Sequence, residues 1–179
     1  MTEATYCPKQ RKREAFLSLQ TNSGEVDFRT PMTIFDSLAH EYGPFDLDAA
    51  ASEVNTLCGE YYDIESDGLR SPWAGKVWCN PPYDNIESWI KKSVQEIKSG
   101  NCETVVLLIP AYTDVAYYHE WIFPLCSTLV FFRSRLRFIG PFVRKGGVSR
   151  HASIAVVFEA GHSGSPTIRS MTAKGRWLT

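Results

Sequence analysis

The segment Asn80-Pro81-Pro82-Tyr83 carries the residue types best suited to chemistry in this sequence. The amide oxygen of Asn80 and the carbonyl oxygen of Pro81 can both accept hydrogen bonds from one NH₂ group. The proline rings fix φ and so hold these acceptors in place, while Tyr83 offers a flat face on which a planar base can stack. Two acceptors on a conjugated amine favour a pyramidal nitrogen whose lone pair points at an electrophile. An ordinary Asn-Pro turn is the alternative interpretation.

The neighbouring patterns place this segment at the end of a strand. Residues 76–79 form a short strand pattern that Pro81 and Pro82 must end, because proline donates no ladder hydrogen bond. Asp84 or Asn85 can then cap an amphipathic helix that ends at Gly100. Ligands of α/β sheets bind beyond the carboxyl ends of strands. The position therefore favours a functional role over a simple turn.

Alternating helix and strand patterns along the chain predict an α/β fold. Thr30 is a good N-cap, Pro31 suits the first helical position, and Gly43 ends that helix. The run over residues 104–109 is continuously apolar, which is typical of a strand buried on both faces of a parallel sheet. The other predicted elements are a strand over residues 44–48, a helix over 115–123, and strands over 128–132, 136–139 and 152–158. We expect a mostly parallel sheet with a late antiparallel hairpin at its edge, followed by loop from Gly161.

The composition suits one globular domain. The chain has 179 residues, of which 44% are hydrophobic and 13% aromatic, enough for a sizeable core. No stretch is apolar enough to span a membrane, and the basic first residues are followed by no apolar run typical of a secretory signal. The cysteines are too scattered for a zinc site or disulfide framework, so we expect buried thiols, no metal and a cytoplasmic location; they are Cys7, Cys58, Cys79, Cys102 and Cys126.

The near-zero net charge of −1 hides a strong asymmetry between the two parts of the chain. Residues 1–120 contain ten Lys and Arg against nineteen Asp and Glu, whereas residues 121–179 contain nine against a single acid, Glu159. Such a split indicates a polyanionic partner. Two surfaces that neutralise each other within the fold would explain it equally well at this point.

The sequence resembles the small phage-type DNA adenine-N6 methyltransferases, the Dam family of phages and prophages, from about residue 27 to residue 158. Five groups of residues carry the resemblance in order along the chain. They are Asp27-Phe28-Arg29-Thr30-Pro31; Gly43-Pro44-Phe45-Asp46-Leu47-Asp48-Ala49-Ala50-Ala51; Asp67-Gly68-Leu69 with Trp73; Val77-Trp78-Cys79-Asn80-Pro81-Pro82-Tyr83; and Arg135-Leu136-Arg137-Phe138 with the strand from Ile154 to Phe158.

This resemblance implies a Rossmann-like methyltransferase fold with S-adenosylmethionine as the methyl donor. Thr30 and Pro31 correspond to an element that holds the methionine end of the donor, where a helix N-terminus also suits a carboxylate. Asp48, followed by the small residues Ala49 and Ala50, corresponds to the acidic motif after the first strand. A helix cap is the plain alternative for Asp48.

The remaining implied roles concern the two adenines. Asp67 resembles the acid that faces the amine of the donor's adenine, although Asp67-Gly68 is also typical of a turn. Asn80, Pro81, Pro82 and Tyr83 correspond to the corner that receives the target adenine of double-stranded DNA, flipped out of the duplex. The implied activity is site-specific methyl transfer to the exocyclic N6 of that adenine.

Basic residues near the end of the chain are candidates for contact with DNA. They are interleaved with aromatic residues and glycines and suit phosphate contacts, or guanine edges in one or two cases, and they are Arg133, Arg135, Arg137, Arg144, Lys145 and Arg150. A solvated edge hairpin that uses charge against aggregation is the alternative. We expect a flexible basic arm over residues 1–25, a methyltransferase domain over 26–160 and a tail over 161–179, in a phage- or prophage-encoded protein.

Two departures and two rival functions qualify the resemblance. The chain lacks a Gly-x-Gly after its first strand, and His151-Ala152-Ser153 stands where the family usually has Pro-Ser. Asn-Pro-Pro-Tyr also serves enzymes that methylate RNA amines or protein glutamine, and a DNA-binding module could keep the fold after losing catalysis. Arg29-Thr30-Pro31 and Asp67-Gly68-Leu69 favour DNA, and an intact Asp48 favours an enzyme.

Overall fold

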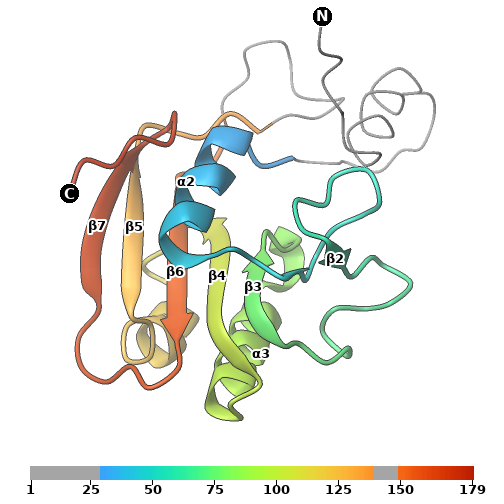
Figure 1. The fold of residues 1–179 in the computed structure, drawn as a ribbon. Helices are drawn as coiled ribbons and strands as arrows, with labels where there is room; N and C mark the ends of the chain where they lie inside the picture. The colour runs from blue at the N-terminus through green and yellow to red at the C-terminus, as the bar shows by residue number, and fades with distance from the viewer. Residues whose placement is uncertain (1–28, 139–148) are drawn as a thin grey trace, which may run out of the picture.

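The computed structural model describes residues 29–138 and 149–179, so the expected basic arm lies outside the described residues. One sheet organises this part of the chain, with the strand order β2-β1-β3-β4-β6-β5-β7 (Figure 1). The strands are β1 (Leu47–Asp48), β2 (Glu60–Tyr61), β3 (Gly75–Cys79), β4 (Cys102–Pro110), β5 (Thr128–Arg133), β6 (Ser153–Glu159) and β7 (Thr167–Thr172). The helical elements are α2 (Met32–Tyr42), the 3₁₀ turn η1 (Tyr83–Asn85), α3 (Ile86–Lys98) and the π-helix η2 (Tyr118–Ile122).

The sheet is parallel except at one strand, which confirms the predicted α/β class. β6 runs antiparallel between β4 and β5, whereas β1, β2, β3 and β4 pair in parallel and β7 pairs in parallel with β5. The carboxyl ends of β1, β3, β4, β5 and β7 therefore share one edge of the sheet. That edge is where ligands of such folds bind.

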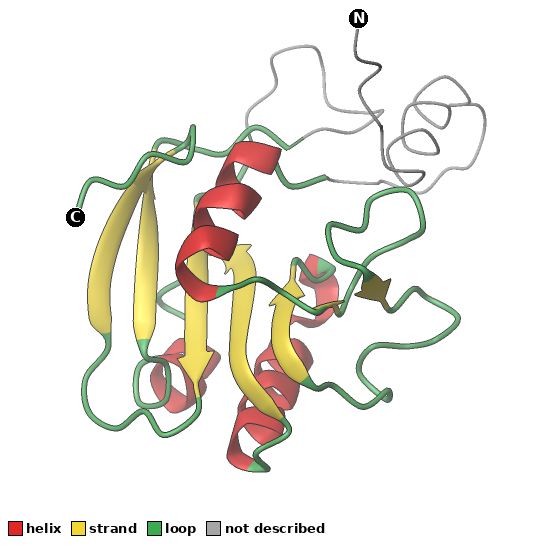
Figure 2. Ribbon diagram, in the orientation of Figure 1, coloured by secondary structure: helices red, strands yellow, loops and turns green. Residues whose placement is uncertain are grey.

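Helices cover both faces of the sheet, so two apolar layers form its core (Figure 2). α3 packs Ile86, Trp89, Ile90 and Val94 against one face, and α2 packs Ile34, Phe35 and Leu38 against the other. The continuous apolar run of β4 follows from this arrangement, because alternate residues of a strand point to opposite faces.

Three expectations about the later part of the chain are wrong. No strand forms over residues 136–138, because β5 is already paired on both sides by β6 and β7; Leu136 and Phe138 instead bury against the α2 layer. The late antiparallel strand β6, expected at the edge of the sheet, lies inside it between β4 and β5. The segment from Gly161, expected to be loop, contains the edge strand β7.

A tight turn after β7 fastens the C-terminal residues to α2. Thr172 and Arg176 exchange hydrogen bonds across this turn, and Ser37 Oγ of α2 donates to the carbonyl oxygen of Gly175 at 2.6 Å. Gly175 has a φ of +85°, and a β-carbon there would lie 2.1 Å from the carbonyl oxygen of Thr33. The turn and the helix thus approach each other at backbone distance.

We predict that Gly175→Ala destabilises the fold more than Gly161→Ala. Both positions have positive φ, but a β-carbon at Gly161 would meet nothing within 4 Å. The left-handed backbone alone costs about 1–2 kcal/mol, and overpacking against α2 should add about 1–3 kcal/mol at Gly175. Urea unfolding of both variants measures this difference. Equal losses of stability would show that the contact between the turn and α2 contributes nothing.

Candidate active site

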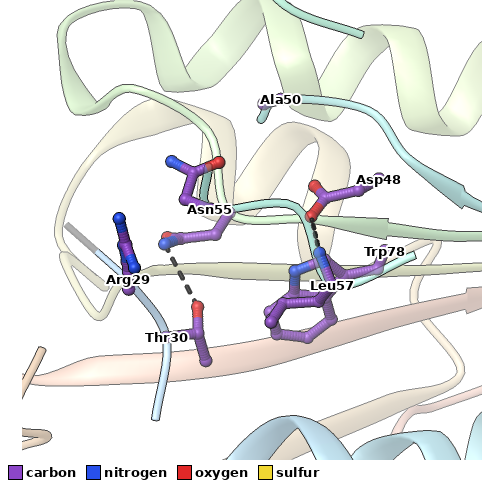
Figure 3. Close-up of a pocket in the computed structure, with 8 residues that line it drawn as sticks. Arg29, Thr30, Asp48, Ala50, Asn55, Leu57 and Trp78 are labelled. Carbon is purple, nitrogen blue, oxygen red and sulfur yellow. Dashed lines mark hydrogen bonds between the residues drawn. The ribbon is translucent and has the colours of Figure 1, made fainter. Parts of the chain in front are cut away.

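Asn80 stands directly beyond β3 and is joined to the start of α2. Its Nδ2 atom donates a hydrogen bond to Thr30 Oγ1 at 3.3 Å (Figure 3). This bond links two segments that are fifty residues apart in sequence. In this arrangement the NH₂ side of the Asn80 amide faces Thr30.

The helix begins one residue later than predicted, which leaves the Thr30 hydroxyl for Asn80. Pro31 occupies the N-cap position of α2, and no side-chain hydrogen bond caps the helix. Thr30 is 5% exposed, so its hydroxyl is held in the site and away from bulk water. A short polar side chain before a helix thus serves the neighbouring strand end and not the helix.

The rest of the Asn-Pro-Pro-Tyr corner forms the beginning of a helical segment. Pro81 is buried and Pro82 is exposed at the N-cap position of η1. Tyr83 remains 38% exposed, and its ring is therefore accessible to a planar partner. Desolvation, with a smaller contribution from Tyr112, raises the pKa of Tyr83 to about 12, so the phenol stays protonated at neutral pH.

Asp48 is the buried carboxylate of the site. Its strand β1 pairs with β3 so that Asp48 lies beside Trp78, two residues before Asn80. The side chain is 3% exposed; Oδ2 accepts a hydrogen bond from the N–H of Leu57 at 3.1 Å, while Oδ1 has no hydrogen-bond partner among the described residues. Burial raises the pKa of Asp48 to about 7, an effect that the N–H groups of Leu57 and Ala50 partly offset.

Asp48 and Asn80 line one small cavity. Its enclosed volume is about 30 Å³, room for a small polar group, and its other lining residues are Arg29, Thr30, Ala50, Asn55, Leu57 and Trp78 (Figure 3). The structure therefore brings together Thr30, Asp48, Ala50 and Asn80 from the predicted set. Asn55 and Leu57 were not predicted, because they follow β1 in a polar stretch without periodicity.

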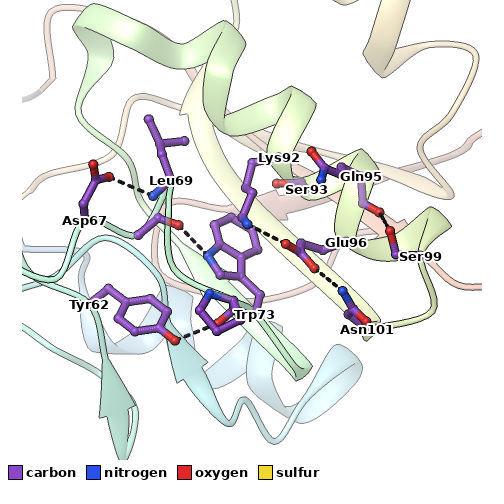
Figure 4. Close-up of polar contacts among 12 residues, drawn as sticks. Tyr62, Asp67, Leu69, Trp73, Lys92, Ser93, Gln95, Glu96, Ser99 and Asn101 are labelled. Atoms are coloured by element: carbon purple, nitrogen blue, oxygen red, sulfur yellow. Dashed lines mark hydrogen bonds and ion pairs between the residues drawn. The ribbon is translucent and has the colours of Figure 1, made fainter.

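Small residues let two loops cross closely above β1. Ala49 is fully buried, and its N–H donates to the carbonyl oxygen of Trp78 at 2.9 Å. A β-carbon at Gly68 would lie 2.0 Å from the carbonyl oxygen of Ala49, so only glycine permits this approach. Asp67 itself does not line the cavity; it accepts a hydrogen bond from the N–H of Leu69 (Figure 4). It also forms an ion pair with Arg70.

The predicted basic residues divide into three groups. Arg133 ends β5, Arg135 and Arg137 follow it, and all three line a second cavity of about 460 Å³ beside Pro31. Arg150 is exposed before β6 and is not among the lining residues of that cavity. Arg144 and Lys145 lie outside the described residues.

Neither a metal site nor a membrane span is found in the described part of the chain. Over residues 29–138 and 149–179, no three His, Cys, Asp or Glu side chains gather as metal ligands. In the same ranges no helix has the length and apolar character needed to cross a bilayer. Four of the five cysteines fall within these residues, and all four are free thiols.

Comparison with known proteins assigns the chain to a group of methyltransferases. A family model described as DNA N-6-adenine-methyltransferase (Dam) matches residues 19–176. A DNA N-6-adenine-methyltransferase of Escherichia phage T1 is 37% identical over 94 residues, which cover 51% of this chain and 38% of the phage protein. Its namesake from Haemophilus phage HP1 (strain HP1c1) is 32% identical over 82 residues, covering 45% and 47% of the two chains. The matched regions thus span less than half the length of either relative.

A solved structure shares the fold. The crystal structure of a candidate RNA methyltransferase from Pyrococcus horikoshii aligns with a TM-score of 0.50 and 12% sequence identity. The alignment covers 86% of this chain and 99% of the other. Similarity at this level concerns the fold alone, and it confirms the expected Rossmann-like methyltransferase sheet.

We predict that, without ligand, the stability of Asp48→Asn relative to the wild type increases as the pH rises. A raised carboxyl pKa means that the folded state keeps a proton which the unfolded chain releases above pH 4, so the free energy of unfolding falls as the pH rises towards 7. Asn cannot titrate and escapes this loss. Its stability advantage over the wild type should grow by about 2–3 kcal/mol between pH 5 and pH 8. Urea unfolding at both pH values measures it, with the exposed Asp84→Asn as the control for loss of one carboxylate.

An advantage that stays constant with pH would show that Asp48 is ionised in the folded protein throughout this range.

Proposed function

The chain belongs to the Dam family of DNA N-6-adenine-methyltransferases, and from this premise we propose that it transfers a methyl group from S-adenosylmethionine to the exocyclic N6 of adenine in double-stranded DNA. One observation carries the proposal. Asp48, whose Oδ1 is buried without a hydrogen-bond partner among the described residues, lines the same cavity as Asn80. Such an oxygen is costly to bury unless a ligand pairs with it.

The cavity fits the amino-acid end of S-adenosylmethionine, which when bound supplies an electrophilic methyl group on a sulfonium. An enclosed volume of about 30 Å³ suits an ammonium group, and Asp48 Oδ1 is its acceptor. Thr30 and Pro31, at the N-terminus of α2, hold the carboxylate of the same end. The small residues Ala49 and Ala50 let the backbone approach the donor closely.

Asp67 contributes at a different part of the donor site. We propose that it faces the amine of the donor's adenine. The next residue, Gly68, packs closely against the backbone of Ala49 and places this turn beside β1. Its ion pair with Arg70 is exposed, so exchange of Arg70 for a ligand amine costs little. This assignment rests on the resemblance of the segment to the family and on its place above β1.

The target adenine is held by the corner beyond β3. Asn80 Oδ1 and the carbonyl oxygen of Pro81 accept the two N6–H bonds, while Pro82 keeps the corner rigid. The hydrogen bond from Asn80 Nδ2 to Thr30 turns the NH₂ of the amide towards Thr30, and Oδ1 is then the amide atom that accepts from the base. Tyr83 stacks on the flipped adenine as a neutral phenol. With the donor bound, N6 would attack its methyl carbon as the bond from that carbon to the sulfonium sulfur breaks. S-adenosylhomocysteine would leave, and the N6 proton would pass to water.

Basic residues beyond β5 and before β6 complete the contact with DNA. Arg133, Arg135, Arg137 and Arg150 are exposed on the described surface, and we propose phosphate contacts for them as for Arg144 and Lys145. Their sequence-independent attraction also makes binding depend on salt. The reaction is proposed to take place in the bacterial cytoplasm, where both donor and DNA occur.

The direct test is transfer of labelled methyl from S-adenosylmethionine to unmethylated duplex DNA, followed by digestion to nucleosides. We expect the label in N6-methyladenine. Asn80→Ala should reduce the rate at least about 10²-fold, because it removes an acceptor that acts in the transition state. Asn85→Ala, an exposed asparagine of the next helix cap, is the control and should retain activity.

Parallel arms with RNA and with protein substrates separate the rival functions. Label in either of these and none in DNA would contradict the proposal while leaving the methyltransferase assignment in place. Absence of both label and donor binding, measured by calorimetry, would instead indicate a binding module.

A second prediction concerns how Asn80 is oriented. Thr30→Val keeps the shape of the side chain but removes the acceptor of the Asn80 Nδ2 hydrogen bond. We expect kcat to fall by about five-fold, while Thr30→Ser retains most of it, since one charge-free hydrogen bond contributes about 1 kcal/mol. Steady-state rates of both variants at saturating donor measure the effect. Equal rates for Thr30→Val and the wild type would show that Thr30 does not orient the amide.

A further inference from the structure

The second cavity is a basic groove formed by segments that lie far apart in the sequence. It has a volume of about 460 Å³ and is lined on one side by Arg133, Arg135 and Arg137, and on the other by Lys174 from the turn after β7. Because β5 and β7 pair in parallel with Arg133 opposite Thr172, both sides of the groove project beyond the same edge of the sheet (Figure 1).

The wall that carries Lys174 is held in place from two directions. The Gly175 carbonyl accepts the hydrogen bond from Ser37 on α2, as described above. Beyond the turn, Met171 pairs with Trp177, whose ring lies 3.9 Å from the Arg169 guanidinium, and Arg169 forms an ion pair with Glu41 of α2. Lys174 is therefore presented by an ordered turn and not by a loose tail.

Few acidic residues of the described part of the chain come from the same region of the sequence as the groove. Residues 121–179 contain the single acid Glu159, which ends β6. Over the described ranges, no carboxylate forms an ion pair with Arg133, Arg135 or Lys174. Arginine and lysine in this arrangement suit phosphate oxygens, which guanidinium groups can bind through two hydrogen bonds.

The groove and the candidate active site share a boundary. Thr30 lines the cavity of Asp48 and Asn80, and the next residue, Pro31, lines the groove. Because these residues are consecutive, the segment before α2 lines both spaces. A nucleotide whose base enters the Asn80 corner must leave its own backbone outside, within reach of this boundary.

We propose that this groove binds the phosphates that flank the flipped adenine, with Lys174 as a phosphate-binding residue opposite the three arginines. The inference rests on the proposed function and assigns the place where the DNA strand leaves the active site. It gives the turn after β7 a role in substrate binding. An acidic protein segment suits the groove less well than DNA does, because the groove lies beside the corner proposed to accept a base.

The test compares Lys174→Ala with Arg176→Ala in duplex binding. Arg176 is exposed in the same turn but does not line the groove, so it controls for loss of one positive charge. Fluorescence anisotropy with a labelled duplex of about 20 bp, titrated at several salt concentrations, gives the affinity and its salt dependence. Lys174→Ala should weaken binding by about three- to ten-fold and reduce the slope of log K against log salt by about 0.9. Arg176→Ala should change both far less.

Affinity for S-adenosylhomocysteine and the melting temperature should be unchanged in Lys174→Ala, which excludes a folding defect or a donor-site effect. Equal binding by Lys174→Ala and the wild type, or equal losses in the two variants, would overturn the groove assignment. Failure of the wild type to bind the duplex would overturn it too. The methylation assay tests the proposed function separately. A salt dependence of DNA binding that changes in Lys174→Ala, without formation of N6-methyladenine, would support the groove and contradict the proposed function.

Discussion

The parallel pairing of β1 with β3 is the constraint on which the rest of the site depends. It sets Leu47 beside Val77 and Asp48 beside Trp78, and the ladder continues through the hydrogen bond from Ala49 N–H to the Trp78 carbonyl. A shift of one residue would turn Asp48 to the opposite face of the sheet and separate it from Asn80. The carboxylate and the amide therefore share a cavity because two short strands are held in one register.

Burial of Asp48 lowers the stability of the ligand-free protein and, in the proposed function, provides an acceptor for the ligand. A buried carboxylate with one oxygen unpaired costs free energy in the ligand-free protein, and the raised pKa of Asp48 reflects that cost. In the proposed donor site, the ammonium group of the ligand would recover this free energy by pairing with Asp48. In the proposed phosphate groove, DNA phosphates would pair with the arginine and lysine side chains in a corresponding way.

The sequence predicts those parts of the fold whose signal is local. β4 and α3 have strong apolar patterns, and the Asn80 corner has prolines that end a strand, so all three were predicted correctly. β7 was missed because its residues are mostly polar and its stability comes from β5 and from the turn fastened to α2. Thr30 shows a subtler limit. Its hydroxyl suits an N-cap and a hydrogen bond to Asn80 equally, and only the three-dimensional arrangement decides between them.

The most direct test of a shared donor and catalytic cavity is amide hydrogen exchange with and without S-adenosylhomocysteine, the unreactive product of the donor. We predict slower exchange at Leu57, whose N–H bonds to Asp48, at Ala49–Ala51, and at Asn80 and Tyr83, the two residues of the corner that have a backbone N–H, while β7 is unchanged. Protection confined to other segments, with none at Leu57 or Asn80, would contradict the placement of the donor beside Asp48 and with it the proposed geometry of methyl transfer.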